Sequence, residues 1–198
     1  MIEVSLYAKM GYGIIEQRRV FMKKLYGEER RNVLLEELKQ AGRPMTGSEL
    51  ARLAHVSRQV VVGDMTLLKA KGEPIIATSQ GYLYLDPSGT KQVSRRIACN
   101  HLPQETEAEL RLLVDCGVTV KDVSIEHPVY GELTAGIHVS TPLDVDLFMQ
   151  RIRETGASYL LELTEGTHIH TITAELPETL SKAVEAMKQH GYLLEEAE

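Results

Sequence analysis

The stretch MTGSELARLAHVSRQVVVGDMTLLKAKG, residues 45–72, decides the fold of the first half of the chain. Thr46 stands three residues before Glu49, which is the spacing of a capping box and predicts that a short helix begins there. Ser57 is a candidate N-cap for a second helix, after a tight turn. Three apolar residues follow it at helical spacing: Val61, Met65 and Leu68. Two short helices joined by a tight turn form a helix-turn-helix.

The residues on both sides extend this motif into a small domain. Upstream, Leu35 and Leu38 belong to an apolar pattern of helical spacing that Gly42 and Pro44 end, which predicts one more helix. Downstream, two apolar runs flank the polar turn TSQG in EPIIATSQGYLYL, residues 73–85, and predict a β-hairpin. A hairpin behind a helix-turn-helix is a wing, so the first half is predicted to be a winged helix-turn-helix domain.

The second helix of a helix-turn-helix presents its N-terminal residues to the major groove of double-stranded DNA. Here these residues are Ser57, Arg58 and Gln59. Arginine pairs with guanine and glutamine with adenine, while a serine hydroxyl can hold a phosphate. Gln80 at the tip of the wing is a further predicted DNA contact, to the backbone or the minor groove. A helical hairpin inside an enzyme shows similar spacing, and this alternative stays open.

The net charge of −6 is unevenly distributed along the 198 residues. Residues 1–90 hold 13 Lys and Arg against 10 Asp and Glu, a balance of +3, whereas residues 91–198 hold 9 against 18, a balance of −9. A mildly basic half joined to a strongly acidic half suggests different partners, although solvated surfaces of unlike sign explain the numbers equally well.

The sequence carries no sign of a membrane or secreted protein. No apolar run approaches the ~20 residues of a membrane-spanning helix, and the N-terminus lacks the pattern of a signal peptide. The two cysteines, Cys99 and Cys116, form no C-x-x-C pair and are expected to be buried reduced thiols. We expect a cytoplasmic protein.

From Ser94 the pattern changes to alternating strands and helices. Single strands are predicted at 95–101, 118–131, 133–140 and 192–196, and residues 159–174 are predicted to form two strands about a glycine turn. The predicted helices span 103–117, 142–156 and 177–191. This order predicts a sandwich-like α/β domain with helices over one sheet, and an α+β class for the whole chain.

Four segments follow from these patterns. Residues 22–86 form the DNA-binding domain, 87–93 the linker and 94–198 the C-terminal domain. Residues 1–21 fit neither domain. A flexible arm, an added dimer helix and a misassigned start, with Met22 as the true one, are the three interpretations, and we favour the last.

Histidines gather in the second domain. In LTEGTHIHT, residues 163–171, the side chains of His168 and His170 point to one face of a strand and can share a ligand. His101 ends a strand just before a helix, and Glu109 lies about two turns into that helix, beside its apolar face. Three imidazoles and one carboxylate suit a divalent transition metal such as zinc, nickel, iron or manganese. Ordinary structural histidines are the alternative.

The segment EHPVYGE, residues 126–132, is the other dense stretch. Pro128 favours an extended His127, and Gly131 permits a tight turn, so His127 and Tyr130 are expected to project into a cleft as ligand-binding residues. An ordinary hairpin with a packed tyrosine is the alternative. The sequence has none of the patterns G-x-x-x-x-G-K-[ST], G-x-S-x-G and G-x-G-x-x-G, and we expect no enzymatic activity.

Together these motifs resemble those of the niacin-responsive transcriptional repressors, in which a biotin-repressor-like winged helix precedes a three-histidine (3H) domain. The resemblance runs from about Met22 to the end of the chain. It rests on the stretch 45–72, IIATSQGYLYL, His101, EHPVYGE and EGTHIHT, in that order.

The resemblance implies a repressor of genes for NAD synthesis or niacin transport, with nicotinic acid as co-repressor bound to the C-terminal domain. It also implies a divalent metal, nickel or zinc, held by four residues: His101, Glu109, His168 and His170. A homodimer on a palindromic DNA operator is implied by how such repressors work.

Three alternatives stay open for the second domain. The metal itself can be the effector, which makes the protein a metal-responsive repressor. The domain can be a metal-dependent enzyme with a DNA-binding head, because three protein ligands with an open position suit catalysis. The pocket can also bind a small acid other than nicotinic acid.

Overall fold

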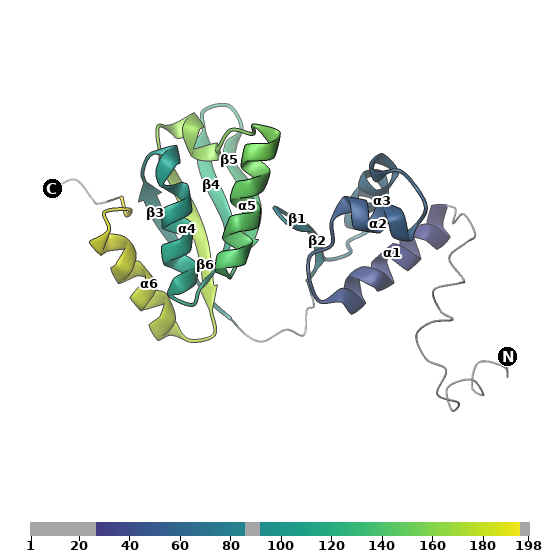
Figure 1. Cartoon of the computed structure of the whole chain (residues 1–198), viewed down its shortest axis with the longest axis horizontal. Helices are drawn as coiled ribbons and strands as arrows, with labels where there is room; N and C mark the ends of the chain where they lie inside the picture. Colours follow the sequence, from purple (N-terminus) through teal and green to yellow (C-terminus); the bar gives the residue numbers. More distant parts are fainter. Residues whose placement is uncertain (1–26, 86–91, 195–198) are drawn as a thin grey trace.

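The computed structural model describes residues 27–85 and 92–194, which form two units (Figure 1). The predicted extension 1–21 and most of the predicted linker 87–93 lie outside the described residues. The first unit consists of helices with a hairpin, and the second of a sheet with helices, so the predicted α+β class is confirmed.

The first unit has the predicted order of helices and hairpin. Its elements are α1 (Gly27–Ala41), α2 (Gly47–Leu53), α3 (Arg58–Ala70), β1 (Ile75–Thr78) and β2 (Gly81–Tyr84). The capping box of Thr46 and Glu49 is formed in both directions, and the Ser57 side chain accepts a hydrogen bond from the amide of Val60. Both helices of the helix-turn-helix therefore begin where the sequence predicts.

An apolar core holds these elements together. The predicted core residues of α1 and α3 are buried in it, together with Leu34: Leu35, Leu38, Val61, Met65 and Leu68. Asp64 lies among them and is only 3% exposed, which the apolar pattern did not indicate. Its carboxylate accepts two hydrogen bonds from the Arg30 guanidinium, at 2.6 Å from Nε and 3.1 Å from Nη2. This bidentate ion pair fixes α1 against α3, because a buried carboxylate needs a compensating charge.

The wing is tied to the start of α2 by a close backbone contact. Met45 and Tyr82 exchange two backbone hydrogen bonds of 2.8 Å each. Gly81, the first residue of β2, has a φ of +139°, and a Cβ on it would lie 2.3 Å from the Met45 carbonyl oxygen. Only glycine fits at this position.

The second unit is a four-stranded antiparallel sheet with helices on one face. Its strands are β3 (Val93–Asn100), β4 (Thr119–His127), β5 (Gly131–Val139) and β6 (Thr167–Ala174), in the order β3-β6-β4-β5. Its helices are α4 (Thr106–Asp115), α5 (Pro142–Thr155) and α6 (Pro177–Gln189). Figure 1 shows these helices side by side in front of the sheet, and apolar side chains of both layers form one core. The predicted sandwich-like arrangement of helices over one sheet is confirmed.

Two predicted strands are wrong. The first strand of the pair at 159–174 is instead a 3-10 helix, η4 (Leu160–Thr164), because the Glu162 carboxylate accepts the Tyr159 amide and closes a helical turn. Glu165 with its left-handed φ of +52° then ends that helix before β6. The predicted closing strand 192–196 is reduced, within the described residues, to a single bridge between Leu193 and Cys99. Across 27–85 and 92–194, no helix is long and apolar enough to span a membrane.

Candidate metal centre and cavity

The four predicted metal-binding residues meet in the interior of the second unit. His168 and His170 lie on β6, His101 follows β3, and Glu109 is on α4. The Glu109 carboxylate lies 2.8 Å from His101 Nε2, 3.3 Å from His168 Nε2 and 3.2 Å from His170 Nε2. Because β3 and β6 are neighbours and α4 follows β3, segments far apart in the sequence converge here. All four residues are at most 6% exposed.

The second ring nitrogen of each histidine faces a backbone carbonyl. The Nδ1 atoms of the three rings lie 2.9, 2.8 and 2.8 Å from carbonyl oxygens, in the pairs His101 with Leu102, His168 with Gly166 and His170 with Asp122. A carbonyl oxygen only accepts hydrogen bonds, so each Nδ1 must carry a proton and donate it. In a neutral ring the lone pair is then on Nε2 and points toward Glu109.

This arrangement calls for a cation between the imidazoles and the carboxylate. Nitrogen lone pairs that face carboxylate oxygens at 2.8–3.3 Å repel them unless protons or a metal ion lie between. Nε2 of His101 is buried and has no partner in hydrogen-bonding geometry among the described residues, although Glu109 Oε2 is 2.8 Å away. Atoms bound to one zinc ion at about 2.1 Å in a tetrahedron lie roughly 3.4 Å apart, so this donor set fits a transition metal.

The charges of the cluster shift its pKa values. Burial raises the pKa of Glu109, but the charge of His170 and the close contacts of the three imidazoles outweigh burial and hold that pKa well below its ordinary range. Burial lowers the pKa of His101 and of His170, yet the neighbouring Glu109 outweighs it and both pKa values are raised. Without a metal, these shifts favour an ionised Glu109 carboxylate beside protonated His101 and His170.

Gly166 allows the two strands to approach at the cluster. It has a φ of +98°, and a Cβ on it would lie 2.5 Å from the His101 carbonyl oxygen. Its own carbonyl accepts the hydrogen bond from His168 Nδ1. Any side chain at Gly166 would therefore push His101 away from His168.

Cys99 is a residue of this site that was not predicted from the sequence. Both cysteines are free, as expected; Cys99 is fully buried, whereas Cys116 is only partly buried. Cys99 pairs with His168 across β3 and β6. Ligand atoms of Cys99, Glu109 and His168 lie within 4.8 Å of one another, so this buried cluster can hold a metal ion. The indication in the sequence is that Cys99 stands only two residues before His101, near the end of β3.

Two possible sets of metal ligands therefore share Glu109 and His168. One set adds His101 and His170, and the other adds Cys99. The geometry favours the imidazoles as the main set, because each of their Nδ1 atoms is held by a carbonyl. Burial and the nearby Glu109 raise the pKa of the Cys99 thiol, which disfavours the thiolate that binds metals.

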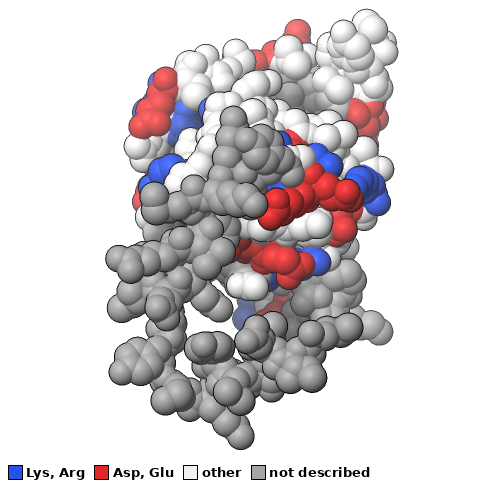
Figure 2. All heavy atoms as spheres, turned by 90° about the vertical axis from the view of Figure 1, so that its right-hand side faces the viewer, with Lys and Arg blue, Asp and Glu red and all other residues white. Residues whose placement is uncertain are grey.

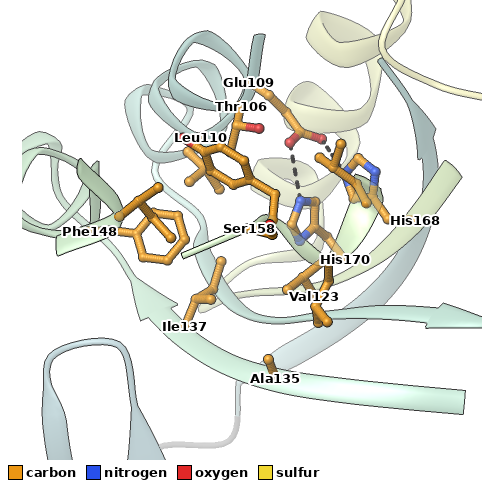
Figure 3. A pocket seen from close by; sticks show the side chains of 14 residues that line it. Thr106, Glu109, Leu110, Val123, Ala135, Ile137, Phe148, Ser158, His168 and His170 are labelled. Carbon is orange, nitrogen blue, oxygen red and sulfur yellow. Dashed lines mark hydrogen bonds and ion pairs between the residues drawn. The ribbon is translucent and has the colours of Figure 1, made fainter. Parts of the chain in front are cut away.

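A cavity of about 180 Å³ lies beside the cluster (Figure 3). Glu109, His168 and His170 line it, and Thr106 stands near Glu109 on the same helix. Much of the rest of its wall is apolar and includes Leu110, Val123, Ala135, Ile137, Phe148 and Ile152. An apolar cavity of ~150 Å³ can hold a benzene ring, so one small aromatic ring fits here.

The structure does not bring His127 and Tyr130 to this cavity. Both belong to the β4–β5 hairpin, where His127 Nδ1 accepts hydrogen bonds from the amides of Val129 and Tyr130 at 3.2 and 3.3 Å. Tyr130 is 73% exposed, and its ring centroid is 4.9 Å from that of His127. This is the ordinary hairpin of the alternative interpretation, with an exposed rather than a packed tyrosine. The ligand-binding role of the two residues stays a prediction that the cavity does not support.

The predicted DNA-reading residues are exposed. Ser57 caps α3, and Arg58 and Gln59 form its first turn on the solvent side. The Arg58 side chain passes along Gly47 of α2, where an added Cβ would lie 3.3 Å from Arg58 Cγ. Figure 2 shows acidic and basic side chains interspersed on the visible part of the face drawn there, so the +3 balance of the first half forms no uniform basic patch among the described residues of that face.

The tip of the wing contacts the second unit. Ser79 Oγ donates to the Ile137 carbonyl at 2.6 Å, and Gln80 Nε2 donates to the His138 carbonyl at 3.3 Å. The backbone carbonyl of Gln80 in turn accepts a hydrogen bond from Arg151 Nη2 at 3.2 Å. The DNA contact of Gln80 stays a prediction, and it would compete with the hydrogen bond that the Gln80 amide makes to β5 of the second unit. Turn chemistry predicts a wing but not what its tip contacts.

Comparison with known domain families gives one match for each unit. A model of an HTH domain matches residues 30–83, and a model of the 3H domain matches residues 94–196. Each match covers nearly all of the unit concerned.

Two relatives match over most of the chain. The "Transcription repressor NadR" of Bacillus subtilis (strain 168) is 53% identical over 175 residues, which is 87% of this chain and 97% of the relative. The "Probable transcription repressor NiaR" of Thermotoga maritima is 37% identical over 169 residues, 85% of this chain and 95% of the relative. Both are transcription repressors and not enzymes, which confirms the expectation of no enzymatic activity. The chain therefore belongs to the NadR and NiaR family of transcription repressors, which join a helix-turn-helix DNA-binding domain to a 3H domain.

Proposed function

We propose that this repressor controls genes of NAD synthesis or niacin transport, with nicotinic acid as its co-repressor and a divalent metal in the 3H domain. The observation that carries the proposal is the small apolar cavity whose wall includes Glu109, His168 and His170. A ligand in that cavity contacts the cluster and the apolar wall at once.

The residues that would hold the metal are His101, Glu109, His168 and His170, with nickel or zinc as the ion that imidazole and carboxylate ligands suit. The bound ion would supply a positive charge beside the cavity, which Glu109, His168 and His170 line. The protein's own contribution is orientation: each Nδ1 is held by a backbone carbonyl, which fixes the ring and its tautomer.

A carboxylate ligand needs this positive charge. Among the described residues that line the cavity, none is lysine or arginine. Residues 91–198 carry a balance of −9, which repels an anion. The carboxylate of nicotinic acid is therefore expected at the cluster end of the cavity, with its ring between the apolar side chains.

The contact of the wing supports a route from the cavity to the DNA-binding domain. Ala135 and Ile137 of β5 and Ile152 of α5 line the cavity. The wing is hydrogen-bonded to the carbonyl of the same Ile137 and to Arg151, the neighbour of Ile152. A ligand that moves β5 or α5 thus moves the wing. Two winged helices held in one arrangement would match a palindromic operator as a homodimer.

The proposal is tested by calorimetric titration of nicotinic acid into the full chain, loaded with nickel or zinc and, separately, after chelation. Nicotinic acid is expected to bind the loaded protein at least 10-fold more tightly, because the chelated cavity offers its carboxylate no metal ion. Nicotinamide, which lacks the negative charge, is the control ligand and should bind weakly to both. Binding of nicotinic acid that ignores the metal contradicts the proposal. No binding at all, with operator affinity following the metal alone, identifies a metal-responsive repressor.

The pKa shifts predict how the stabilisation by metal depends on pH. The raised pKa values of His101 and His170 mean that their pairing with Glu109 stabilises the metal-free fold below about pH 6.5 and is lost as the pH rises through the raised values. The lowered pKa of Glu109 means that the ionised carboxylate also stabilises the fold, and that this stabilisation is lost only in acid. Metal binding instead needs deprotonated imidazoles. The difference in Tm between loaded and chelated protein should therefore be larger at pH 8 than at pH 6. An equal or opposite difference contradicts the assignment of the histidines.

Arg58→Ala should weaken operator binding by about 1–3 kcal/mol, which is roughly 5- to 150-fold, if Arg58 pairs with guanine. Fluorescence anisotropy at fixed salt measures this on DNA from upstream of the neighbouring genes. Lys188→Ala, the loss of one charge at an exposed position of α6, is the matched control. Equal losses in both variants would mean that Arg58 acts only through net charge.

Arg151→Ala should uncouple the two domains without removing either function. Nicotinic acid should still bind, but the factor by which it tightens operator binding, about 5- to 150-fold for typical coupling, should fall toward one. Arg153→Ala makes the same change at an exposed position two residues further along α5 and should keep the factor. A full response in Arg151→Ala would show that the wing contact does not transmit the signal.

A further inference from the structure

Among the described polar side chains of the cavity wall, one buried group has no interaction partner. Glu109, His168 and His170 interact with one another, and the Tyr159 hydroxyl lies 3.9 Å from the sulfur of Met149. Ser158 is exposed. Thr106, by contrast, is only 6% exposed, and its Oγ1 has no hydrogen-bond partner among the described residues.

The unused hydroxyl of Thr106 is not explained by the fold. Thr106 is the first residue of α4, and its hydroxyl donates neither to a carbonyl of the preceding turn nor to another described residue. A buried hydroxyl without a partner destabilises the folded state, and valine would fill the same volume without that cost. An unpartnered hydroxyl that lines a cavity therefore points to a ligand that supplies the missing partner.

The place of Thr106 limits which ligand atom it can reach. Thr106 and Glu109 are three residues apart on α4, so their side chains are neighbours on one face of the helix, with Cβ atoms about 5–6 Å apart. Figure 3 shows both side chains projecting from this helix on the cavity side. A carboxylate directed to the cluster therefore leaves the other side of a single ring within reach of Thr106.

We propose that Thr106 is a specificity-determining residue, whose hydroxyl donates a hydrogen bond to a ring nitrogen of the ligand. The ligand class is then a monocyclic heteroaromatic acid, in which the carboxylate meets the histidine and glutamate cluster and the ring nitrogen meets Thr106. This inference rests on the proposed function and adds to it how the site distinguishes a pyridine from a benzene ring.

The test compares nicotinate with benzoate, which has the same shape and charge but no ring nitrogen. Calorimetric titration with both acids is carried out on the metal-loaded full chain and on Thr106→Val. The wild-type chain should prefer nicotinate by about 3- to 10-fold, the range expected of one hydrogen bond, and Thr106→Val should lose this preference. Thr106→Ser, which keeps the hydroxyl, should retain it.

Thr173→Val is the matched control. Thr173 is 4% exposed and its Oγ1 also lacks a partner among the described residues, but it does not line this cavity. The preference for nicotinate should be unchanged in this variant. Metal affinity and Tm of the metal-free protein should not fall in Thr106→Val, since the substitution removes an unsatisfied hydroxyl.

The outcomes separate the two claims. A Thr106→Val protein that keeps the wild-type preference for nicotinate over benzoate overturns the role of Thr106 and leaves the proposed function standing. A metal-loaded wild-type chain that binds neither acid overturns the proposed function, and this inference with it.

Discussion

A carboxylate with no solvent exposure must be compensated by the groups around it, and the carboxylate of Glu109 is compensated by three imidazoles. The 3H domain is built around this constraint. The pairing of β3 with β6 brings His101, which follows β3, to within 4.8 Å of His168 between ring centroids. Gly166 allows the close approach, and α4 brings in the carboxylate. Each imidazole is in turn fixed by a backbone carbonyl, so the cluster depends on the backbone of several elements. A buried ion cluster of this kind is retained at a cost to stability, which favours a functional over a purely structural origin.

The same constraint connects the site to the rest of the chain. The cavity beside Glu109 is walled in part by β5 and α5, and these are the elements that contact the wing of the DNA-binding domain. The wing is also tied to the start of α2 through Met45 and Tyr82, so it contacts both domains. A change at the cavity therefore has a short covalent and hydrogen-bonded path to the helix-turn-helix. A ligand favours one arrangement of the two domains over another if it binds to that arrangement more tightly.

Much of this was readable from the sequence, because it depends on local chemistry. The capping box at Thr46, the N-cap at Ser57 and the alternation of His168 and His170 are each decided by residues a few positions apart. The cluster as a whole was reached from residue types together with a family resemblance. What could not be predicted is what distant segments do to one another. The ion pair of Asp64 with Arg30, the place of Cys99 beside His168 and the docking of Gln80 on β5 all join residues that only the tertiary fold brings together. The cavity wall likewise comes from separate strands and helices.

The central claim is that an acid bound beside the cluster and DNA bound to the helix-turn-helix influence each other through the folded chain. Thermodynamic linkage makes this influence reciprocal. The most direct measurement is the affinity of the metal-loaded protein for nicotinic acid, determined by titration with and without saturating operator DNA. Operator should tighten nicotinic acid binding by the same factor by which nicotinic acid tightens operator binding, and both factors should become one after chelation. An affinity for nicotinic acid that is the same with and without operator would contradict the account.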